Sequence, residues 1–280
     1  MLARDFVVIA VIVLFVLFYV YRKQKKKNRE AWLRKRGLAS KWQKFLEDNV
    51  NLYSRLPKQY RKALHGYINV FLDDKQFIGC DDFVITDETR LVIAAQACVL
   101  LLGLESDVYP DFHTVMVYPT AYYAEESVSD GLVVTQEKSL RSGESWSRGV
   151  VVLSWEEVVD NSRGDSPGHN VVVHEFAHRL DQQNSIAEGV PVLDSRRLYE
   201  RWASVLGSEF ETLQRGVAQG EQSVIDAYGA TSPAEFFAVV SELFFELPKV
   251  LERHHPKLYR QLWGYYKLDT AAWDKQRAPE

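Results

Sequence analysis

The chain has 280 residues, a net charge of −4 and 46% hydrophobic residues. This length is enough for one sizeable core with a small additional lobe, and the acidic balance, with no basic patch interleaved with aromatic residues, argues against direct nucleic-acid binding. The two cysteines, Cys80 and Cys98, are too few for a disulfide framework and lie in no metal-ligand pattern. We interpret both as packing thiols that stay reduced in a cytoplasm.

An apolar run from Phe6 to Tyr21 opens the chain. The run is apolar on every face, which is unusual for a core helix, and no small-residue cleavage pattern follows it, as a signal peptide would require. We therefore predict one transmembrane helix over residues 1–21. The basic residues that follow it place the C-terminal side in the cytoplasm, so the predicted location is the inner (plasma) membrane, single-pass; they are Arg22, Lys23, Lys25, Lys26, Lys27 and Arg29.

Residues 22–45 predict a charged helical stalk, and residues 46–280 a folded domain. Helices are expected at 52–72, broken at Pro57, and at 86–102, begun by Thr86. Short apolar segments at 113–118, 132–135 and 150–153 predict strands, and further helices are expected at 195–217, 232–246 and 256–267. The order predicts an α+β fold that is dominated by helices, with a small β-sheet.

The sequence His174-Glu175-Phe176-Ala177-His178 lies in an apolar stretch that predicts a buried helix, with Asn170 as a possible N-cap. Residues four apart share one face of a helix, so the two imidazoles can bind one metal ion. Buried histidines and a buried carboxylate are costly to desolvate without partners, and a metal ion supplies one. The pattern predicts one Zn²⁺ ion, with Glu175 as the general base for a bound water.

The third protein ligand is expected to lie outside this helix. A longer zinc motif would place Gly and His where this chain has Asp181 and Asn184, so that template does not apply. The predicted helix 232–246, which Ser232 can cap, carries three candidate carboxylates, and spacing alone does not choose among them: Glu235, Glu242 and Glu246. Asp181 could orient a ligand histidine or could lie in the following loop, paired with an arginine such as Arg179.

At this point the chain resembles the Mlc titration factor A family of zinc metallopeptidases, which have a zincin-like fold similar to lethal-factor-type peptidases. The resemblance covers roughly residues 50–270 and rests on blocks in matching order: 174–181, Gly189-Val190-Pro191, Ile225-Asp226-Ala227-Tyr228 and 233–238, with 142–155 upstream. The resemblance implies that Glu235 is the third zinc ligand and that Tyr228 faces the metal.

The resemblance also implies an activity, peptide hydrolysis that is described mainly as aminopeptidase-like, with a peptide or protein as the substrate. The family's founding member binds a transcriptional repressor, so the alternative function is a regulatory protein that sequesters such a repressor at the membrane. The founding member is soluble, whereas this chain carries a predicted anchor, and that departure puts the same partner in doubt. We therefore expect a membrane-anchored zinc metallopeptidase whose domain, residues 46–280, faces the cytoplasm.

Overall fold

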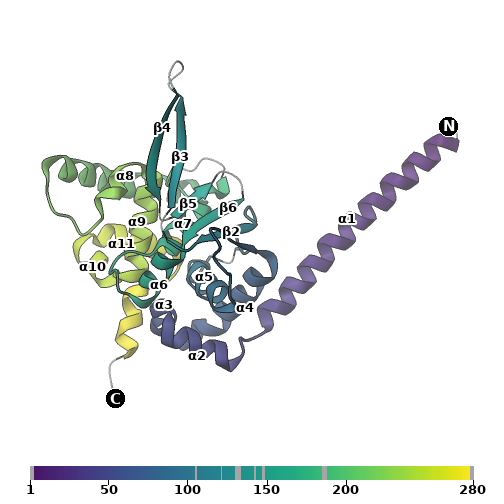
Figure 1. Cartoon of the computed structure of the whole chain (residues 1–280), viewed down its shortest axis with the longest axis horizontal. Helices are drawn as coiled ribbons and strands as arrows, with labels where there is room; N and C mark the ends of the chain where they lie inside the picture. The colour runs from purple at the N-terminus through teal and green to yellow at the C-terminus, as the bar shows by residue number, and fades with distance from the viewer. Residues whose placement is uncertain are drawn as a thin grey trace.

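The computed structural model describes residues 3–104, 106–120, 122–129, 134–141, 143–146, 149–184 and 188–277. Two parts project from a mainly helical body: helix α1 (Ala3–Lys35) and the antiparallel hairpin of β3 (Tyr122–Ser129) and β4 (Val134–Arg141) (Figure 1). The strand predicted at 132–135 falls partly outside the described residues, and its described end belongs to β4. The hairpin itself was not predicted from the sequence.

The expected transmembrane helix over residues 1–21 is not supported. In the part of the chain that the structure describes, no helix combines the length and the apolar character that crossing a membrane requires. The apolar stretch of α1 passes without a break into a strongly basic stretch of the same helix.

The last turns of α1 pack on helix α4 (Lys58–Asp74). Lys26 Nζ lies 2.8 Å from a carboxylate oxygen of Asp74, and the Arg34 guanidinium lies 4.6 Å from the centroid of the Tyr67 ring. Gly66 is required at this crossing, because a Cβ there would lie 2.4 Å from the Arg34 carbonyl oxygen. The charged half of α1 is therefore joined to the body of the domain.

The helices next to Pro57 and Thr86 begin where the sequence predicts, whereas the break at residues 36–39, inside the predicted stalk, was not predicted. Pro57 separates α3 (Asn51–Arg55) from α4, because proline cannot continue a helix but suits its start. Helix α2 (Ser40–Asn49) precedes them. Thr86 caps α5 (Asp87–Val99) by accepting a hydrogen bond from the backbone N–H of Thr89, 3.1 Å away.

The central sheet has the strand order β1-β2-β6-β5. Strands β1 (Gln76–Gly79), β2 (Thr114–Tyr118) and β6 (Val150–Ser154) are parallel, and β5 (Gly143–Trp146) is antiparallel to β6. The two inner strands, β2 and β6, were predicted from the sequence. In the structure, Val115 and Val117 are buried and alternate with less buried residues of β2, and β6 is almost wholly buried. The edge strands β1 and β5 were not predicted.

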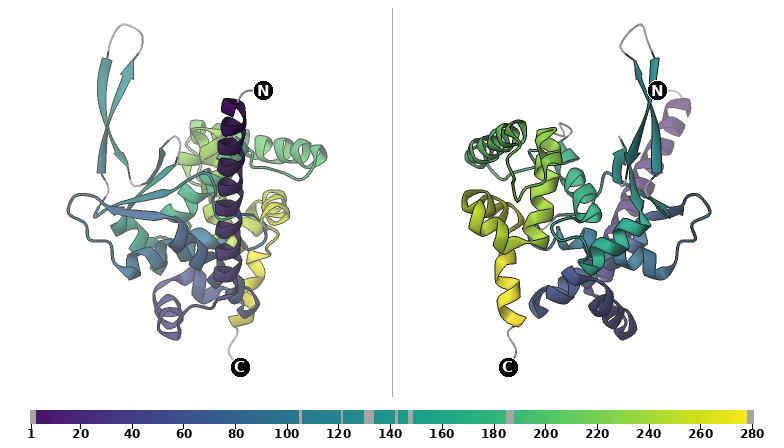
Figure 2. Two further views of the ribbon diagram at one scale, coloured as in Figure 1. Left: turned by 90° about the vertical axis from the view of Figure 1, so that its right-hand side faces the viewer. Right: turned by 60° about the vertical axis from the view of Figure 1, so that its left-hand side comes forward.

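After β6 the described chain forms helices and no strand, which together with the small sheet confirms the predicted helix-dominated α+β fold. In the right-hand view of Figure 2, the C-terminal helices lie on one side of the molecule and the strands on the other. Helix α7 (Val171–Asp181) contacts both, since it packs against α9 (Pro233–Glu246), α5 and strands β5 and β6. The remaining elements are α6 (Trp155–Arg163), η1 (Gln182–Asn184), α8 (Arg196–Gln219), η2 (Ala227–Ala230), α9 (Pro233–Glu246), α10 (Pro248–His254), α11 (Pro256–Tyr266) and η3 (Thr270–Arg277).

Candidate metal centre

The start of α7 sets the position of the two histidines. Asn170 is the predicted N-cap, and its Oδ1 accepts a hydrogen bond from the backbone N–H of Val173 at 3.0 Å. His174 and His178 follow one turn apart, and their ring centroids are separated by 4.8 Å. Both side chains are buried to about the same degree, with 9% of each residue exposed.

Glu235 approaches the histidines from the first turn of α9. The hydroxyl of Ser232 accepts a hydrogen bond from the Glu235 backbone N–H at 3.2 Å, and Pro233 occupies the first helical turn, as the sequence predicts. Helix α9 packs along α7, so a carboxylate in its first turn can reach the imidazoles across the helix pair.

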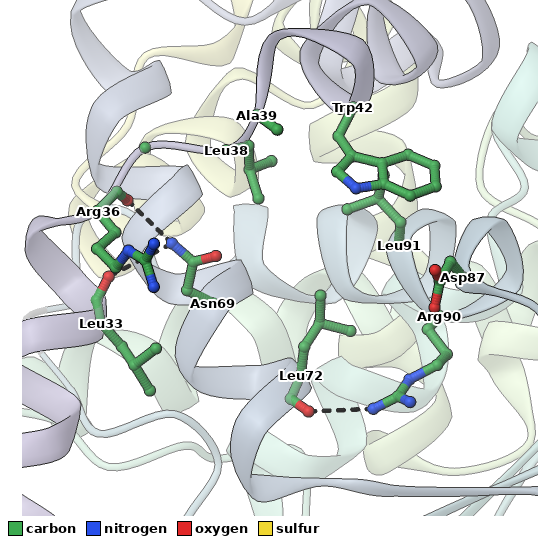
Figure 3. A pocket seen from close by; sticks show the side chains of 11 residues that line it. Leu33, Arg36, Leu38, Ala39, Trp42, Asn69, Leu72, Asp87, Arg90 and Leu91 are labelled. Atoms are coloured by element: carbon green, nitrogen blue, oxygen red, sulfur yellow. Dashed lines mark hydrogen bonds between the residues drawn. The ribbon is translucent and has the colours of Figure 1, made fainter.

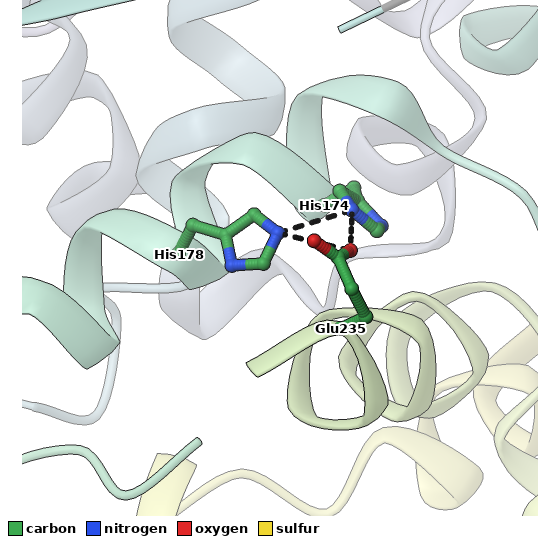
Figure 4. Close-up of side chains that lie close together, drawn as sticks. All are labelled: His174, His178 and Glu235. Atoms are coloured by element: carbon green, nitrogen blue, oxygen red, sulfur yellow. Dashed lines mark hydrogen bonds and ion pairs between the residues drawn. The ribbon is translucent and has the colours of Figure 1, made fainter. Parts of the chain in front are cut away.

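The structure brings His174, His178 and Glu235 together (Figure 4). Glu235 Oε2 lies 3.0 Å from His174 Nε2 and 3.2 Å from His178 Nε2, and the two Nε2 atoms are 3.2 Å apart. The three atoms thus form a nearly equilateral triangle with no side chain between them. At the tetrahedral corners of a zinc site with bonds of about 2.0–2.1 Å, ligand atoms lie about 3.3 Å apart. The donor set and its spacing therefore fit Zn²⁺.

The charges of these groups also favour a cation. Burial opposes protonation of His174, but hydrogen bonds with Glu235 and Glu242 raise its pKa well above the usual value. Burial alone would raise the pKa of Glu235, yet hydrogen bonds with His174 and His178 hold it at about 2. His174 thus tends to gain a proton and Glu235 tends to stay ionised. Both shifts favour positive charge between these side chains, which a divalent metal ion would supply.

Glu175 lies next to the triangle on the same helix and is almost completely buried, with 3% of the residue exposed. Burial raises the pKa of its carboxyl group to about 7, although the nearby His174 and His178 act in the opposite direction. Among the described residues, its Oε2 atom has no hydrogen-bond partner. An unsatisfied buried carboxylate oxygen is costly in a folded protein and is typical of a group that acts on a substrate or water.

The other two candidate carboxylates of α9 lie deeper than Glu235. Glu242 Oε1 is 2.7 Å from His174 Nδ1, the ring nitrogen that faces away from the triangle. Glu246 accepts a hydrogen bond from the side-chain amide of Asn170 at 2.6 Å. Neither is part of the group of possible ligand atoms, so the geometry selects Glu235. The contact between Glu242 and His174 was not predicted from the sequence, although the seven-residue spacing to Glu235 placed both on one face.

Tyr228 lies in η2, beside the metal-site residues. Its ring centroid is 6.0 Å from that of His174, and 54% of the residue is exposed. Asp226 fixes the turn, because its Oδ1 accepts a hydrogen bond from the Tyr228 backbone N–H at 2.7 Å. The tyrosine therefore borders the site from the solvent side.

Asp181 has neither of the two roles considered from the sequence, which were to orient a ligand histidine and to pair with an arginine such as Arg179. Its Oδ2 accepts a hydrogen bond from the Gly189 backbone N–H at 2.8 Å, whereas Arg179 bonds to the Val150 carbonyl oxygen and the Gln182 side chain. The carboxylate thus holds the loop that follows α7. This loop supports α9, since a Cβ at Gly189 would lie 2.1 Å from the Pro233 carbonyl oxygen.

Two of the remaining histidines have a hydroxyl or carboxylate partner of their own. Buried His65 lies 2.8 Å from the Tyr53 hydroxyl, and His255 lies 2.7 Å from Glu209. A cavity of about 450 Å³ opens at the junction of α1 and α2, between Leu33, Trp42 and Arg90 (Figure 3). It contains none of the predicted site residues.

Comparison with known proteins gives a family match over most of the chain. Residues 22–267 match the family model described as glucose-regulated metallo-peptidase M90. The chain belongs to this family of metallopeptidases. An uncharacterized protein of Synechocystis sp. is 46% identical over 86% of this chain and 88% of its own length. The Mlc titration factor A of Pectobacterium atrosepticum is 36% identical over 80% and 85%, and that of Serratia proteamaculans 32% over 83% and 88%.

Proposed function

We propose that this protein is a zinc-dependent peptidase in which His174, His178 and Glu235 hold one Zn²⁺ ion. The observation that carries the proposal is the convergence of these three donor atoms from two helices, in a member of a metallopeptidase family. Glu175, buried and with an unsatisfied oxygen beside the triangle, supplies the group that a hydrolytic site needs besides the metal.

Zn²⁺ held there would lower the pKa of a water molecule and polarise the carbonyl group of the scissile bond. In the proposed mechanism, Glu175 accepts the proton of the attacking water and delivers it to the leaving amine. The position of Tyr228 next to His174 supports a role for its hydroxyl group as a hydrogen-bond donor to the oxygen that becomes negative.

The test of this proposal is the variant Glu175→Gln, which keeps the size of the side chain but removes the base. We expect kcat for peptide hydrolysis to fall by about 10²- to 10⁴-fold while one zinc ion per chain stays bound. The control is Glu252→Gln, an exposed residue of α10, which should behave as the wild type. Full activity of Glu175→Gln would disprove the role of Glu175.

The choice of substrates in this assay separates two kinds of peptidase. Peptides with free N-termini and the same peptides with acetylated N-termini are compared. An aminopeptidase, as the resemblance implies, would cleave only the free peptides, since it must bind the terminal amine.

The alternative function is the sequestration of a transcriptional repressor, as the family resemblance implies; the similar protein of Pectobacterium atrosepticum is named for the titration of Mlc. Its test is binding of a purified repressor to the inactive Glu175→Gln variant. Saturable binding without cleavage by the wild type would favour this alternative over the peptidase.

We also propose, from the sequence, that the protein lies at the cytoplasmic face of the inner membrane. The support is the apolar stretch of α1, whose side chains from Val8 to Tyr21 are exposed, and the basic residues that follow. Cell fractionation of the full chain and of a chain that begins at residue 22 tests this. Equal recovery of both in the soluble fraction would contradict it.

A further inference from the structure

Glu242 is a buried carboxylate that contacts a predicted metal ligand on the side away from the metal. One oxygen lies 2.7 Å from His174 Nδ1, and the other accepts a hydrogen bond from the Asn170 backbone N–H at 2.6 Å. The opposite ring nitrogen, Nε2, faces Glu235 and His178. The two nitrogens of His174 therefore have different surroundings, one a carboxylate and the other the metal-binding triangle.

This difference decides which nitrogen is available to a metal. A neutral imidazole carries a proton on one nitrogen and a free lone pair on the other, and only the lone pair binds a metal ion. A carboxylate only accepts hydrogen bonds, so its position at Nδ1 favours the form with the proton there. The lone pair is then on Nε2, directed at Glu235 and His178.

We propose that Glu242 is a positioning residue, which fixes the tautomer and the ring orientation of His174 so that Nε2 is ready to bind Zn²⁺. The inference rests on the proposed zinc site. A carboxylate that accepts the second N–H of a ligand histidine also makes the imidazole a stronger ligand. Glu242 is thus expected to act on zinc affinity without touching the metal or a substrate.

Asn170 holds Glu242 in this position. Its backbone N–H bonds to Glu242, while its side-chain amide donates to Gln96 of α5 at 2.8 Å and to Glu246 at 2.6 Å. Its Oδ1 caps α7 at the same time. The residue therefore ties the start of α7 to α9 and α5, and both oxygens of Glu242 have fixed donors, His174 and Asn170. Rotation of this carboxylate would leave buried polar groups unsatisfied.

Glu246 provides a matched control, because it lies one turn after Glu242 on the same helix and in the same buried network. It contacts Asn170 but not His174. A general loss of packing or of network hydrogen bonds would affect Glu242→Gln and Glu246→Gln alike, whereas an effect through His174 would appear only in the first variant.

The experiment measures the zinc dissociation constant of the full chain by competition with a chromogenic chelator. In Glu242→Gln, an amide faces either His174 Nδ1 or the Asn170 N–H with donor against donor, so the arrangement is lost. We expect zinc affinity to fall by about 10- to 100-fold in this variant and to change by less than about twofold in Glu246→Gln. Equal zinc affinity of Glu242→Gln and wild type would overturn the inference.

A second measurement on the wild type does not depend on the folding of a variant. Nitrogen-15 NMR of histidine-labelled, zinc-loaded protein should show His174 coordinated through Nε2, with an exchange-protected proton on Nδ1. Coordination through Nδ1 would overturn the inference. Wild-type protein that binds no zinc would instead refute the proposed function itself, so the two failures are distinguishable.

Discussion

Buried titratable side chains are concentrated around α7 and α9, and each must find a partner or change its charge. Glu242 and Glu235 have partners in the histidines, whereas Glu175 and Glu246 have pKa values raised to about 7 by burial. A buried carboxyl group with a raised pKa lowers the free energy of unfolding when the pH forces it to ionise inside the protein. Buried carboxyl groups beside the metal ligands therefore make the stability of the protein depend on pH.

Glu246→Gln is predicted to change the pH dependence of stability. The unfolded state ionises Glu246 near its usual pKa of 4.5, but the folded state keeps the proton until about pH 7. The folded state therefore binds more protons between these values, and the wild type loses stability as pH rises through this window, by up to about 3 kcal/mol. Glutamine stays neutral and avoids this loss.

Urea unfolding of zinc-free protein at about pH 4 and about pH 8 measures the effect. The stability of Glu246→Gln relative to wild type should increase toward the higher pH. A difference between the two proteins that is the same at both pH values would show that Glu246 ionises normally in the folded state.

At the scale of elements, local signals predicted most of the helices, but not α6 and α10, and missed part of the sheet. Asn170, Ser232 and Thr86 cap their helices as expected, because a cap is decided by residues within a few positions of it. Strands β1 and β5 are four residues long and lie at sheet edges, so their existence depends on partners that are distant in sequence.

The same reasoning applies to the site. The spacing of His174, Glu175 and His178 predicts their shared helix face, but the choice of Glu235 over Glu242 depends on how α9 lies along α7. The angle at which α9 packs on α7 is determined by the whole core, and the spacing of the carboxylates in the sequence does not predict it. The family resemblance, and not local physics, supplied Glu235 at the sequence level.

The loop at Gly189 is predicted to control where α9 begins. Gly189 has φ +73°, and a Cβ there would lie 2.1 Å from the Pro233 carbonyl oxygen; Gly220 has φ +71° but no atom within 4 Å of its Cβ position. Both alanine variants incur left-handed strain of about 1–2 kcal/mol. Gly189→Ala should lose about 1–3 kcal/mol more, because the clash displaces the loop or the start of α9.

Denaturant unfolding of both variants gives the two losses in stability, and chelator competition gives the zinc affinity. Zinc affinity should weaken only in Gly189→Ala, since Pro233 precedes Glu235 by two residues. Equal losses of stability and unchanged zinc binding in the two variants would contradict a supporting role for this loop.

At the scale of the whole molecule, zinc is predicted to join α7, which packs on the sheet, to α9 of the C-terminal helices. His174 and His178 follow the sheet in the chain, whereas Glu235 comes from the C-terminal helices, so an ion that binds all three stabilises the folded state only. At a free zinc concentration of about 100 times the dissociation constant, the gain is about 2.7 kcal/mol.

Thermal unfolding with zinc and with excess chelator checks this prediction. The wild type should unfold at a clearly lower temperature in chelator. Glu235→Ala, which lacks one ligand, should show a much smaller difference. A wild-type unfolding temperature that does not respond to chelator would mean that zinc does not bridge α7 and α9.

The most direct test of the account is a crystal structure of the zinc-loaded protein with anomalous scattering recorded at the zinc edge. We predict one strong peak at about 2.0–2.2 Å from His174 Nε2, His178 Nε2 and a Glu235 carboxylate oxygen, with Glu242 on the far side of His174. A peak on Glu242, or one that lacks either histidine or Glu235 as a ligand, would contradict it.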